Sequence, residues 1–369
     1  MNLKKTNYYI SIILPTLNEV ENISSIIKQI INLSNKFLIE IIVVDDASKD
    51  GTTTLLKKLS KKDKRIRLIN RFDRNGLSSA IKEGSLSASG DIIAVMDTDG
   101  QHKVENLFEA IEELIKSKKD LIIGSRFLNN SSIKGLSDKR RKGSSIANSL
   151  ARNSLSKNYL KLTDIMSGFI VFKSEKVLKI VEKIDVNGFK FLYELLSVSN
   201  GILDCKEIPL DFMPRKFGES KLDIAIVWDF FVSLIHSFLK RLIPRKAISF
   251  AFVGITGVLV QLSVSYSLMW FLGFTFQRVL PIAVVIAASS NFFVNNWLTF
   301  RVNRLKNRAF VVGLCKFLIV SSLPIIANVG LASSFYNLIS PNTLLSQLAG
   351  IVVVFIWNYA ASSRLVWNN

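Results

Sequence analysis

Apolar and polar residues follow two different periods along the first part of the chain. Short runs rich in Ile and Val alternate with stretches in which apolar residues recur every three to four positions. The first pattern is typical of buried strands and the second of amphipathic helices. The strands are expected at Tyr8–Leu14, Ile39–Asp45, Ile66–Asn70, Asp91–Met96 and Leu121–Gly124. The helices are expected at Asn22–Leu33, Thr52–Lys62, Leu77–Ala88 and Val104–Lys116. This alternation predicts an α/β domain whose parallel sheet has helices on both faces.

The pattern changes near Lys246. All 29 acidic residues and 41 of the 48 Lys and Arg residues lie before this point, whereas Ala247–Asn369 has no Asp or Glu and only seven basic residues. A helix that spans a bilayer needs about 20 apolar residues. We therefore expect residues 246–369 to form an all-α transmembrane domain of four helices. Their expected spans are 247–272, 280–300, 310–336 and 344–367.

A further helix is predicted between the two parts. Leu222–Ile243 is apolar around most of its circumference, with a polar stripe that includes Asp229, Ser233 and Ser237. Such a helix is typical of one that lies in the membrane interface. The expected domain boundaries are therefore 1–221, 222–245 and 246–369.

The basic residues near the expected spans predict the orientation. Lys and Arg precede the first span and recur between the second and third, while the loop between the third and fourth has no charge. The positive-inside rule then places both termini and the first domain on the cytoplasmic side of a multi-pass cell membrane. The first residues lack the apolar run of a signal peptide, which agrees with this orientation.

The formal charge of +19 suits nucleic acid, anionic lipid headgroups or phosphate-bearing substrates. Nucleic acid is disfavoured because the sequence has no zinc-ligand spacing, basic heptad helix or aromatic RNA-binding signature. Membrane lipids are the expected partners of the apolar part. The two cysteines, Cys205 and Cys315, lie in different parts, so no disulfide is expected.

The strongest candidate for chemistry is Asp97-Thr98-Asp99, which follows the apolar run Ile92–Val95. In open sheets of this kind, ligands bind beyond the carboxyl ends of the strands. Two carboxylates there can hold a divalent cation, and the cation can neutralise a diphosphate. The alternative is a solvated, Asp-rich turn.

Two other motifs precede this pair in the chain: Ile12–Glu19 and Ile42–Thr52. The ordered set, with Gly90-Asp91 before the acidic pair, resembles family 2 inverting glycosyltransferases with the Rossmann-like GT-A fold. The resemblance is to the dolichol- or polyprenyl-phosphate mannose synthase branch, over about residues 8–221.

The resemblance implies two neighbouring binding sites. The nucleotide of the donor would be bound by Pro15, Thr16, Asn18, Glu19, Asp45, Asp46 and Asp97. The cofactor, Mg²⁺ or Mn²⁺, would be bound by Asp97, Asp99 and Gln101. For Asp45 and Asp46, helix N-terminal capping is the alternative role.

Basic residues later in the chain match family positions that bind the phosphate of the acceptor. They are Arg126, Arg140, Ser144, Arg215 and Lys221. Guanidinium groups suit this role because they bind two phosphate oxygens at once. Arg141, next to Arg140, leaves that register open by one residue, and a solvated basic face is the alternative.

Thr163–Phe169 resembles the family's Asp-x-x-Ser-Gly-Phe loop near the acceptor. A phosphate acceptor needs no general base, since its second pKa is about 6 and one oxygen is already anionic. Asp164 is therefore expected to position other groups. The resemblance makes Asp97, Asp99, Gln101, Arg126 and Asp164 the catalytic set.

The expected reaction is a single displacement that inverts the anomeric carbon, with polyprenyl or dolichyl phosphate as acceptor. GDP-mannose is favoured over UDP-glucose as donor, and the oligomeric state is left open. The alternatives are another lipid acceptor, such as diacylglycerol, and a component of a lipid-linked sugar flippase. The Gln/Arg-x-x-Arg-Trp motif typical of processive polysaccharide synthases is absent from the sequence.

The apolar part resembles the GtrA-like four-helix family, on the motif Phe250–Gly257 and the Asn and Trp residues near the ends of the second and fourth spans. Gly254 and Gly257 are expected to allow close helix approach. Asn291, Asn295 and Asn296 are expected either to hydrogen-bond within the domain or to contact lipid.

Overall fold

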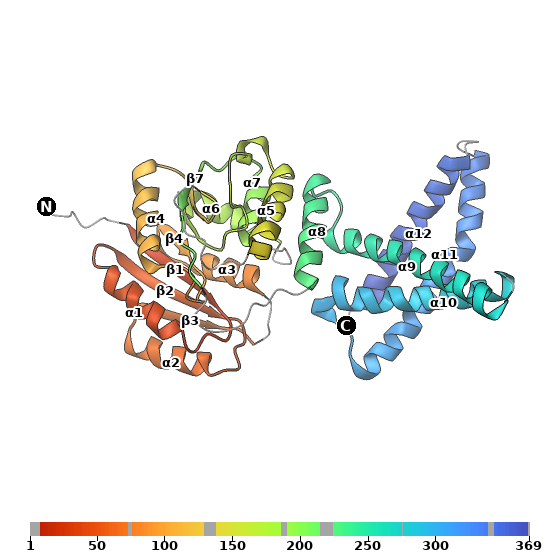
Figure 1. Ribbon diagram of the computed structural model, residues 1–369, viewed down its shortest axis with the longest axis horizontal. Helices are drawn as coiled ribbons and strands as arrows, with labels where there is room; N and C mark the ends of the chain where they lie inside the picture. Colours follow the sequence, from red (N-terminus) through yellow and green to blue (C-terminus); the bar gives the residue numbers. More distant parts are fainter. Residues whose placement is uncertain are drawn as a thin grey trace. The chain divides into compact units, whose positions relative to one another are not determined.

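The computed structural model describes residues 8–72, 76–128, 138–185, 190–214, 224–274, 276–338 and 343–367. The chain divides into two compact units, Met1–Phe238 and Leu239–Asn369 (Figure 1).

Unit 1 is built on a seven-stranded sheet with the order β3-β2-β1-β4-β6-β5-β7. Its strands are β1 (Tyr9–Thr16), β2 (Leu38–Asp45), β3 (Ile66–Asn70), β4 (Ile92–Val95), β5 (Leu121–Ser125), β6 (Ile170–Lys173) and β7 (Cys205–Pro209). The five predicted strands are confirmed as β1 to β5. All five run in the same direction, as predicted, while β6, which was not predicted, runs antiparallel to both β4 and β5. Periodicity reports burial and does not encode strand direction.

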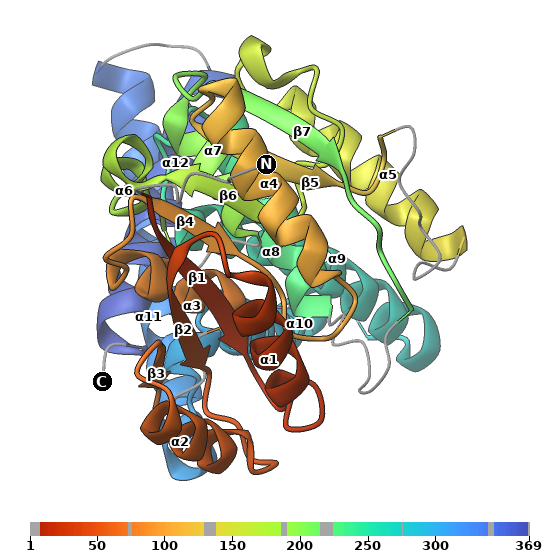
Figure 2. The ribbon, with the colours of Figure 1, turned by 90° about the vertical axis from the view of Figure 1, so that its left-hand side faces the viewer.

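Helices cover both faces of this sheet. They are α1 (Ile23–Leu33), α2 (Thr52–Lys62), α3 (Leu77–Leu86), α4 (Val104–Ser117), α5 (Asp138–Asn153), α6 (Ser174–Val181), α7 (Phe191–Ser199) and α8 (Ile224–Phe238), with a 3₁₀ turn η1 at Lys157–Tyr159. Figure 2 shows α1 and α4 over the near face of the sheet, with α3 behind it. Alternate strand residues supply the two cores: Ile12 and Leu14 pack with α1 and α4, while Ile13 packs with α3 and α7. This alternation is the period of a pleated strand.

Helix α8 packs onto α7 through polar contacts. The Tyr193 hydroxyl donates to Ser237 Oγ at 2.9 Å, and the Ser197 and Ser237 hydroxyls lie 2.9 Å apart. The stripe that the sequence marked as polar therefore faces the protein. Ile224, Val227 and Phe231, on another side of the helix, remain exposed. The predicted helix ends at Phe238, earlier than expected.

Unit 2 consists of helices. They are α9 (Arg245–Leu272), α10 (Phe276–Val294), a π-helical turn η2 (Asn295–Thr299), a 3₁₀ turn η3 (Arg301–Asn303), α11 (Asn307–Leu338) and α12 (Thr343–Leu365). Among the described residues, Arg245–Leu272 and Ile282–Thr299 are long and apolar enough to cross a membrane. Both fall where the first two spans are predicted.

Asn296 holds the end of this unit together. Its Oδ1 accepts from the Leu305 backbone N–H at 2.8 Å and from Trp367 Nε1 at 3.1 Å, and its Nδ2 donates to the Leu305 carbonyl. Hydrogen bonding within the domain is thus confirmed for Asn296. Gly257 packs against the Asn291 side chain, as close approach requires. At Gly254 no described atom lies within 4 Å of a Cβ built there, so close approach at this residue stays a prediction.

Candidate active site

The carboxyl ends of β1, β2 and β3 lie side by side. Register places Thr16 beside Asp45, and Asp45 beside Asn70. Beyond the strands, the Asp46 N–H donates to the Thr16 carbonyl at 2.9 Å, which prolongs the pairing. The predicted nucleotide residues therefore meet at one edge of the sheet.

Asp45 is fully buried and organises its own loop. Its carboxylate accepts hydrogen bonds from the backbone N–H and hydroxyl of Ser48 and from the Thr53 hydroxyl in α2. These bonds fix the turn between β2 and α2. They do not cap α2, whose N-cap residue is Gly51; the Thr52 N–H donates instead to Asp50 Oδ1 at 3.0 Å. A contact of Asp45 with nucleotide remains a prediction.

Asp46 holds the neighbouring loop. Its Oδ1 accepts from Arg71 Nη1 at 2.8 Å, and its Oδ2 accepts from the Gly76 N–H at 2.9 Å. Arg71 also donates to Ser79 Oγ and pairs with Glu83. Asp46 thereby fixes the start of α3.

The loop after β1 is tied to the loop after β2. Asn18 adopts a left-handed conformation with φ of 54°. Its N–H donates to Ser48 Oγ and its Oδ1 accepts from the Lys49 N–H, both at 2.8 Å. The Glu19 N–H donates to Thr52 Oγ1 at 3.0 Å.

Residues of the same loop also contact nearer neighbours. The Glu19 side chain accepts from Asn22, the Thr16 hydroxyl donates to the Leu14 carbonyl, and the Pro15 carbonyl accepts from Thr98 Oγ1 at 3.1 Å. All six residues predicted to bind nucleotide ahead of Asp97 thus belong to one connected pair of loops.

The acidic pair follows β4. Thr98 is buried beneath the β1 loop, while Asp97 and Asp99 on either side of it are half-buried. The Asp97 carboxylate lies on the backbone of Gly168, where a Cβ would come within 2.5 Å of Oδ2. His102 Nε2 lies 3.8 Å from the same oxygen, and its ring packs between Phe169 and Phe212.

Cations keep Asp97 ionised. Burial opposes its ionisation, but His102, Lys190 and Arg126 outweigh that effect and hold the pKa of Asp97 below its usual value. The negative charge of Asp97 in turn favours the protonated form of Lys190. Burial lowers the pKa of Lys190, against the attraction of Asp97.

Lys190 was not predicted as a site residue. It directly precedes α7. The one signal was an isolated cation within the apolar segment 189–192.

Gln101 is held by the chain beyond β7. The side-chain Nε2 donates to the Met213 carbonyl at 3.0 Å, and the backbone carbonyl of Gln101 accepts from the Met213 N–H at 2.9 Å. Among the described residues, no group of three or more His, Cys, Asp or Glu side chains is placed to hold a metal ion. A metal here would depend on the predicted ligands Asp97, Asp99 and Gln101, with its other ligands from substrate and water. That suits Mg²⁺, which usually takes one or two carboxylates together with phosphate oxygens.

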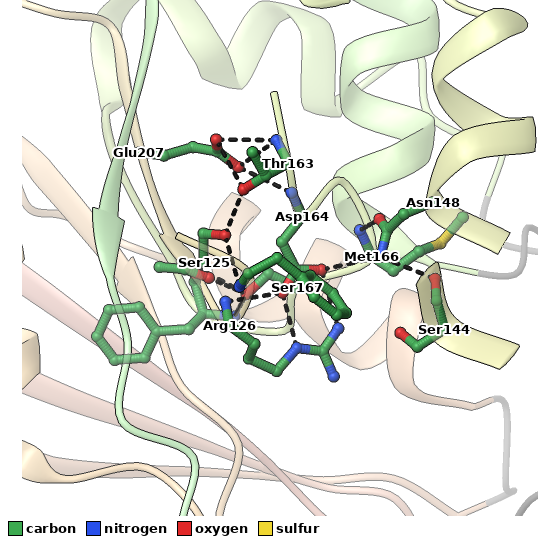
Figure 3. A network of polar contacts seen from close by, with 12 residues as sticks. Ser125, Arg126, Ser144, Asn148, Thr163, Asp164, Met166, Ser167 and Glu207 are labelled. Atoms are coloured by element: carbon green, nitrogen blue, oxygen red, sulfur yellow. Dashed lines mark hydrogen bonds and ion pairs between the residues drawn. The ribbon is translucent and has the colours of Figure 1, made fainter. Parts of the chain in front are cut away.

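Arg126, just after β5, is bound by Asp164 in a bidentate pair. Nε donates to Oδ2 at 2.7 Å and Nη2 donates to Oδ1 at 2.9 Å, while the Arg126 backbone N–H also donates to Oδ2 at 3.1 Å (Figure 3). Asp164 is fully buried. Burial works against the charge of Arg126, but Asp164 and Asp97 raise its pKa. The guanidinium also lies over the rings of Phe127 and Phe212, at 5.6 and 5.5 Å.

The other predicted acceptor residues are placed only in part. Ser144 lies on α5, where its carbonyl accepts from Asn148 Nδ2 at 3.1 Å. Arg140 lies in the first turn of α5, but its side chain is outside the described residues, as are Arg215 and Lys221.

Comparison with known proteins shows the family of the chain. Residues 11–180 match the model of glycosyl transferase family 2, and residues 249–367 match that of the GtrA/DPMS transmembrane domain. A dolichol-phosphate mannosyltransferase of Pyrococcus furiosus is 30% identical over 363 residues, which cover 97% of this chain and 99% of the relative. The chain belongs to the dolichol-phosphate mannosyltransferase family. It is a glycosyltransferase with a membrane domain.

Other relatives of this glycosyltransferase match less of the chain. A dolichol-phosphate mannosyltransferase of Mycosarcoma maydis is 32% identical over 234 residues, covering 63% of this chain and 74% of the relative. Among solved structures, glucosyl-3-phosphoglycerate synthase from Mycobacterium tuberculosis, with Mn²⁺, UDP and glucosyl-3-phosphoglycerate, is 17% identical with a TM-score of 0.46. It covers 64% of this chain and 81% of that one.

Proposed function

We propose that this glycosyltransferase transfers a hexose, with mannose from GDP-mannose favoured, to the phosphate of a polyprenyl or dolichyl lipid, with inversion at the anomeric carbon. One observation carries the proposal: the loop Thr163–Phe169 contacts both sides of the site, with Gly168 against the Asp97 carboxylate and Asp164 bound to Arg126. The leaving diphosphate is an anion that the acidic pair could accept only through a bound divalent cation, whereas the attacking phosphate could bind a guanidinium directly. The relatives named dolichol-phosphate mannosyltransferases support this lipid class.

The donor would lie along the loops after β1, β2 and β4. Thr16, Asn18, Glu19 and their neighbours face the nucleotide, and Asp97 and Asp99 face the diphosphate. A bound Mg²⁺ or Mn²⁺ would supply the positive charge that stabilises the leaving diphosphate. Because the pKa of Asp97 is lowered, its carboxylate is ionised at neutral pH and ready for a cation.

The acceptor phosphate would approach Arg126. Asp164 binds one edge of the guanidinium through Nε and Nη2, so the orientation of the group is fixed before a substrate arrives. A fixed donor costs little reorganisation when charge develops. Asp164 is thus a positioning residue, and the lipid phosphate is the nucleophile without a general base.

We further propose that the enzyme is a multi-pass membrane protein whose unit 2 crosses the bilayer four times, with both termini in the cytoplasm. The exposed apolar residues Ile224, Val227 and Phe231 on α8 suit insertion into the membrane interface. That placement would bring unit 1 to the level of the lipid phosphate.

Radiolabelled sugar transfer tests the proposal. Full-length protein in detergent is supplied with GDP- or UDP-sugars, Mg²⁺ or Mn²⁺, and polyprenyl phosphate or diacylglycerol. We expect labelled product from GDP-mannose and polyprenyl phosphate, and no product from Asp99→Ala with an unchanged unfolding temperature. Asp63→Ala, at a surface carboxylate paired with Arg65, is the matched control and should be active.

Several outcomes would contradict the proposal. Product from UDP-glucose alone would show that the donor is not GDP-mannose. Product on diacylglycerol alone would show that the acceptor is not polyprenyl phosphate. Full activity of Asp99→Ala would remove the metal from the reaction. Movement of lipid-linked sugar across vesicles without any transfer would favour a flippase component.

A further inference from the structure

Resting on the proposed function, we propose that Glu207 on β7 is a positioning residue for the acceptor site. It fixes the loop Thr163–Phe169, and the loop in turn fixes Arg126 through Asp164. In the described part of the chain, the side-chain hydrogen bonds of Glu207 are to Thr163 and Asp164, so it acts on the acceptor site through this loop.

Glu207 binds the start of the loop with both carboxylate oxygens. Oε1 accepts from the backbone N–H groups of Thr163 and Asp164 at 2.9 and 2.8 Å. Oε2 accepts from the Thr163 N–H at 2.8 Å and from its hydroxyl at 3.1 Å. These are charge-assisted bonds to consecutive residues, which fix the backbone direction at Asp164.

The placement of Glu207 is itself set by the sheet. β7 pairs in parallel with β5, and Glu207 lies opposite Ile123 in the register. Arg126 follows the end of β5. One pair of adjacent strands therefore supplies both the anchor of the loop and the arginine that the loop holds.

The loop fixes the position of Arg126 through Asp164. The Asp164 carboxylate is fully buried and accepts three hydrogen bonds from Arg126, one of them from its backbone N–H. Figure 3 shows Asp164 between Glu207 and Arg126. A shift of the Asp164 backbone would therefore turn the guanidinium.

Other contacts hold the rest of the loop. Asn148 Oδ1 accepts from the Met166 N–H at 3.2 Å, and Ser167 Oγ donates to the Gly124 carbonyl at 2.7 Å. These contacts do not involve Glu207, so the loop keeps a support when Glu207 is changed. The change at Glu207 is expected to move the loop locally and leave the fold intact.

Glutamine at position 207 separates the carboxylate chemistry from side-chain size. A carboxamide has one acceptor oxygen, and its NH₂ group would face N–H donors of the loop. Glu207→Gln should therefore lose part of the anchor. Glu113→Gln is the matched control, because Glu113 is a surface carboxylate that pairs with Lys206, the neighbour of Glu207.

The first test is kinetic and uses the full-length enzyme in detergent. Glu207→Gln should raise the KM for polyprenyl phosphate on the order of tenfold, as changes in supporting contacts do, while calorimetry shows nucleotide-sugar affinity within about twofold of wild type. In the Arg126→Lys background the same change should add little, because its effect acts through the guanidinium. An equal effect in both backgrounds, or an unchanged acceptor KM, would overturn the proposal. Thr163→Val removes the contacts of the hydroxyl with Glu207 Oε2 and Ser125 Oγ and leaves the three backbone N–H bonds to Glu207. It should give a smaller change in the same direction and serves if Glu207→Gln is poorly folded.

The second test does not depend on the acceptor. Hydrogen–deuterium exchange should show lost protection in Glu207→Gln both at residues 163–166 and at the Arg126 N–H. Lost protection in the loop with unchanged protection at the Arg126 N–H would show that Glu207 does not act on Arg126, and would overturn the proposal. If wild type transfers nothing to polyprenyl phosphate, the proposed function fails while this measurement still decides the role of Glu207.

Discussion

The carboxylates on the two sides of the candidate site have partners at different distances along the chain. On the donor side, Asp45 binds Ser48 and Thr53, three and eight residues away. On the acceptor side, Asp164 binds Arg126, 38 residues away, and its N–H binds Glu207, 43 residues away. Asp46 on the donor side reaches further than Asp45, to Arg71 and Gly76, 25 and 30 residues away. The acceptor site exists only once β5, β7 and the intervening loop have assembled, so it should be the side more sensitive to distant substitutions.

The acidic pair joins the two sides, and its loss should have the largest effect. Asp97→Ala removes a carboxylate that lies against Gly168 and near both Arg126 and Lys190. We expect turnover to fall by about a thousandfold, because a charge that stabilises the leaving group is worth several kcal/mol. Radiolabelled transfer measures it. Activity within tenfold of wild type would show that the pair is not the link between the two sides.

The acceptor side is tested next by Arg126→Lys. Lysine keeps the charge but cannot form the bidentate pair with Asp164. We expect kcat/KM for the lipid phosphate to fall on the order of a hundredfold, with nucleotide-sugar affinity unchanged. Arg152→Lys is the control, since Arg152 donates to a backbone carbonyl on the same unit. A collapse of donor affinity would instead assign Arg126 to the donor side.

On the donor side, Asp46→Asn should have a smaller effect than Arg126→Lys, and it should affect the donor and not the acceptor. It weakens the buried pair with Arg71 that fixes the start of α3. Breaking such a pair is expected to cost about 2 kcal/mol of stability. The KM for the nucleotide-sugar should rise several-fold while the acceptor KM is unchanged, as measured by kinetics with a thermal unfolding curve. An equal rise in both KM values would mean that the two sides are not separable.

The smallest effect is expected at the other end of the strands, near their amino ends and away from the candidate site. Glu40 is buried there and accepts from Ser11, Arg67 and the Ser89 N–H. Burial opposes the ionisation of Glu40, but the hydrogen bonds from Ser11, Arg67 and Ser89 lower its pKa. Their stabilisation is therefore present above the usual glutamate pKa and is lost as the pH falls through the lowered value.

Glu40→Gln should cost about 1 kcal/mol at neutral pH, and the difference from wild type should shrink on acidification. Thermal unfolding at a series of pH values checks this. Turnover at neutral pH should be unchanged, and a large loss of activity would contradict the assignment of function to the carboxyl ends of the strands.

Much of the fold was predictable because it depends on local pattern. Burial on alternate positions predicted β1 to β5, and helical periodicity predicted α1 to α4. The order of the motifs predicted that Thr16, Asp45 and Asp97 would meet, since the ends of parallel strands share an edge. The antiparallel β6 was not predicted, and neither was the pairing of β7 with β5, because a short apolar run does not specify the partner or the direction of a strand.

The sequence alone determined the division into a charged α/β unit and an apolar helical unit, and the position of Asp97 and Asp99 after a buried strand. Those features follow from composition and from side chains within a few residues of one another. Only the tertiary structure decided that Asp164 holds Arg126, that Glu207 holds Asp164, that Gln101 binds Met213, and that the polar stripe of α8 faces the protein. Each of those depends on which strands and helices become neighbours, and that choice is made by the packing of the whole unit and is not written in any local segment.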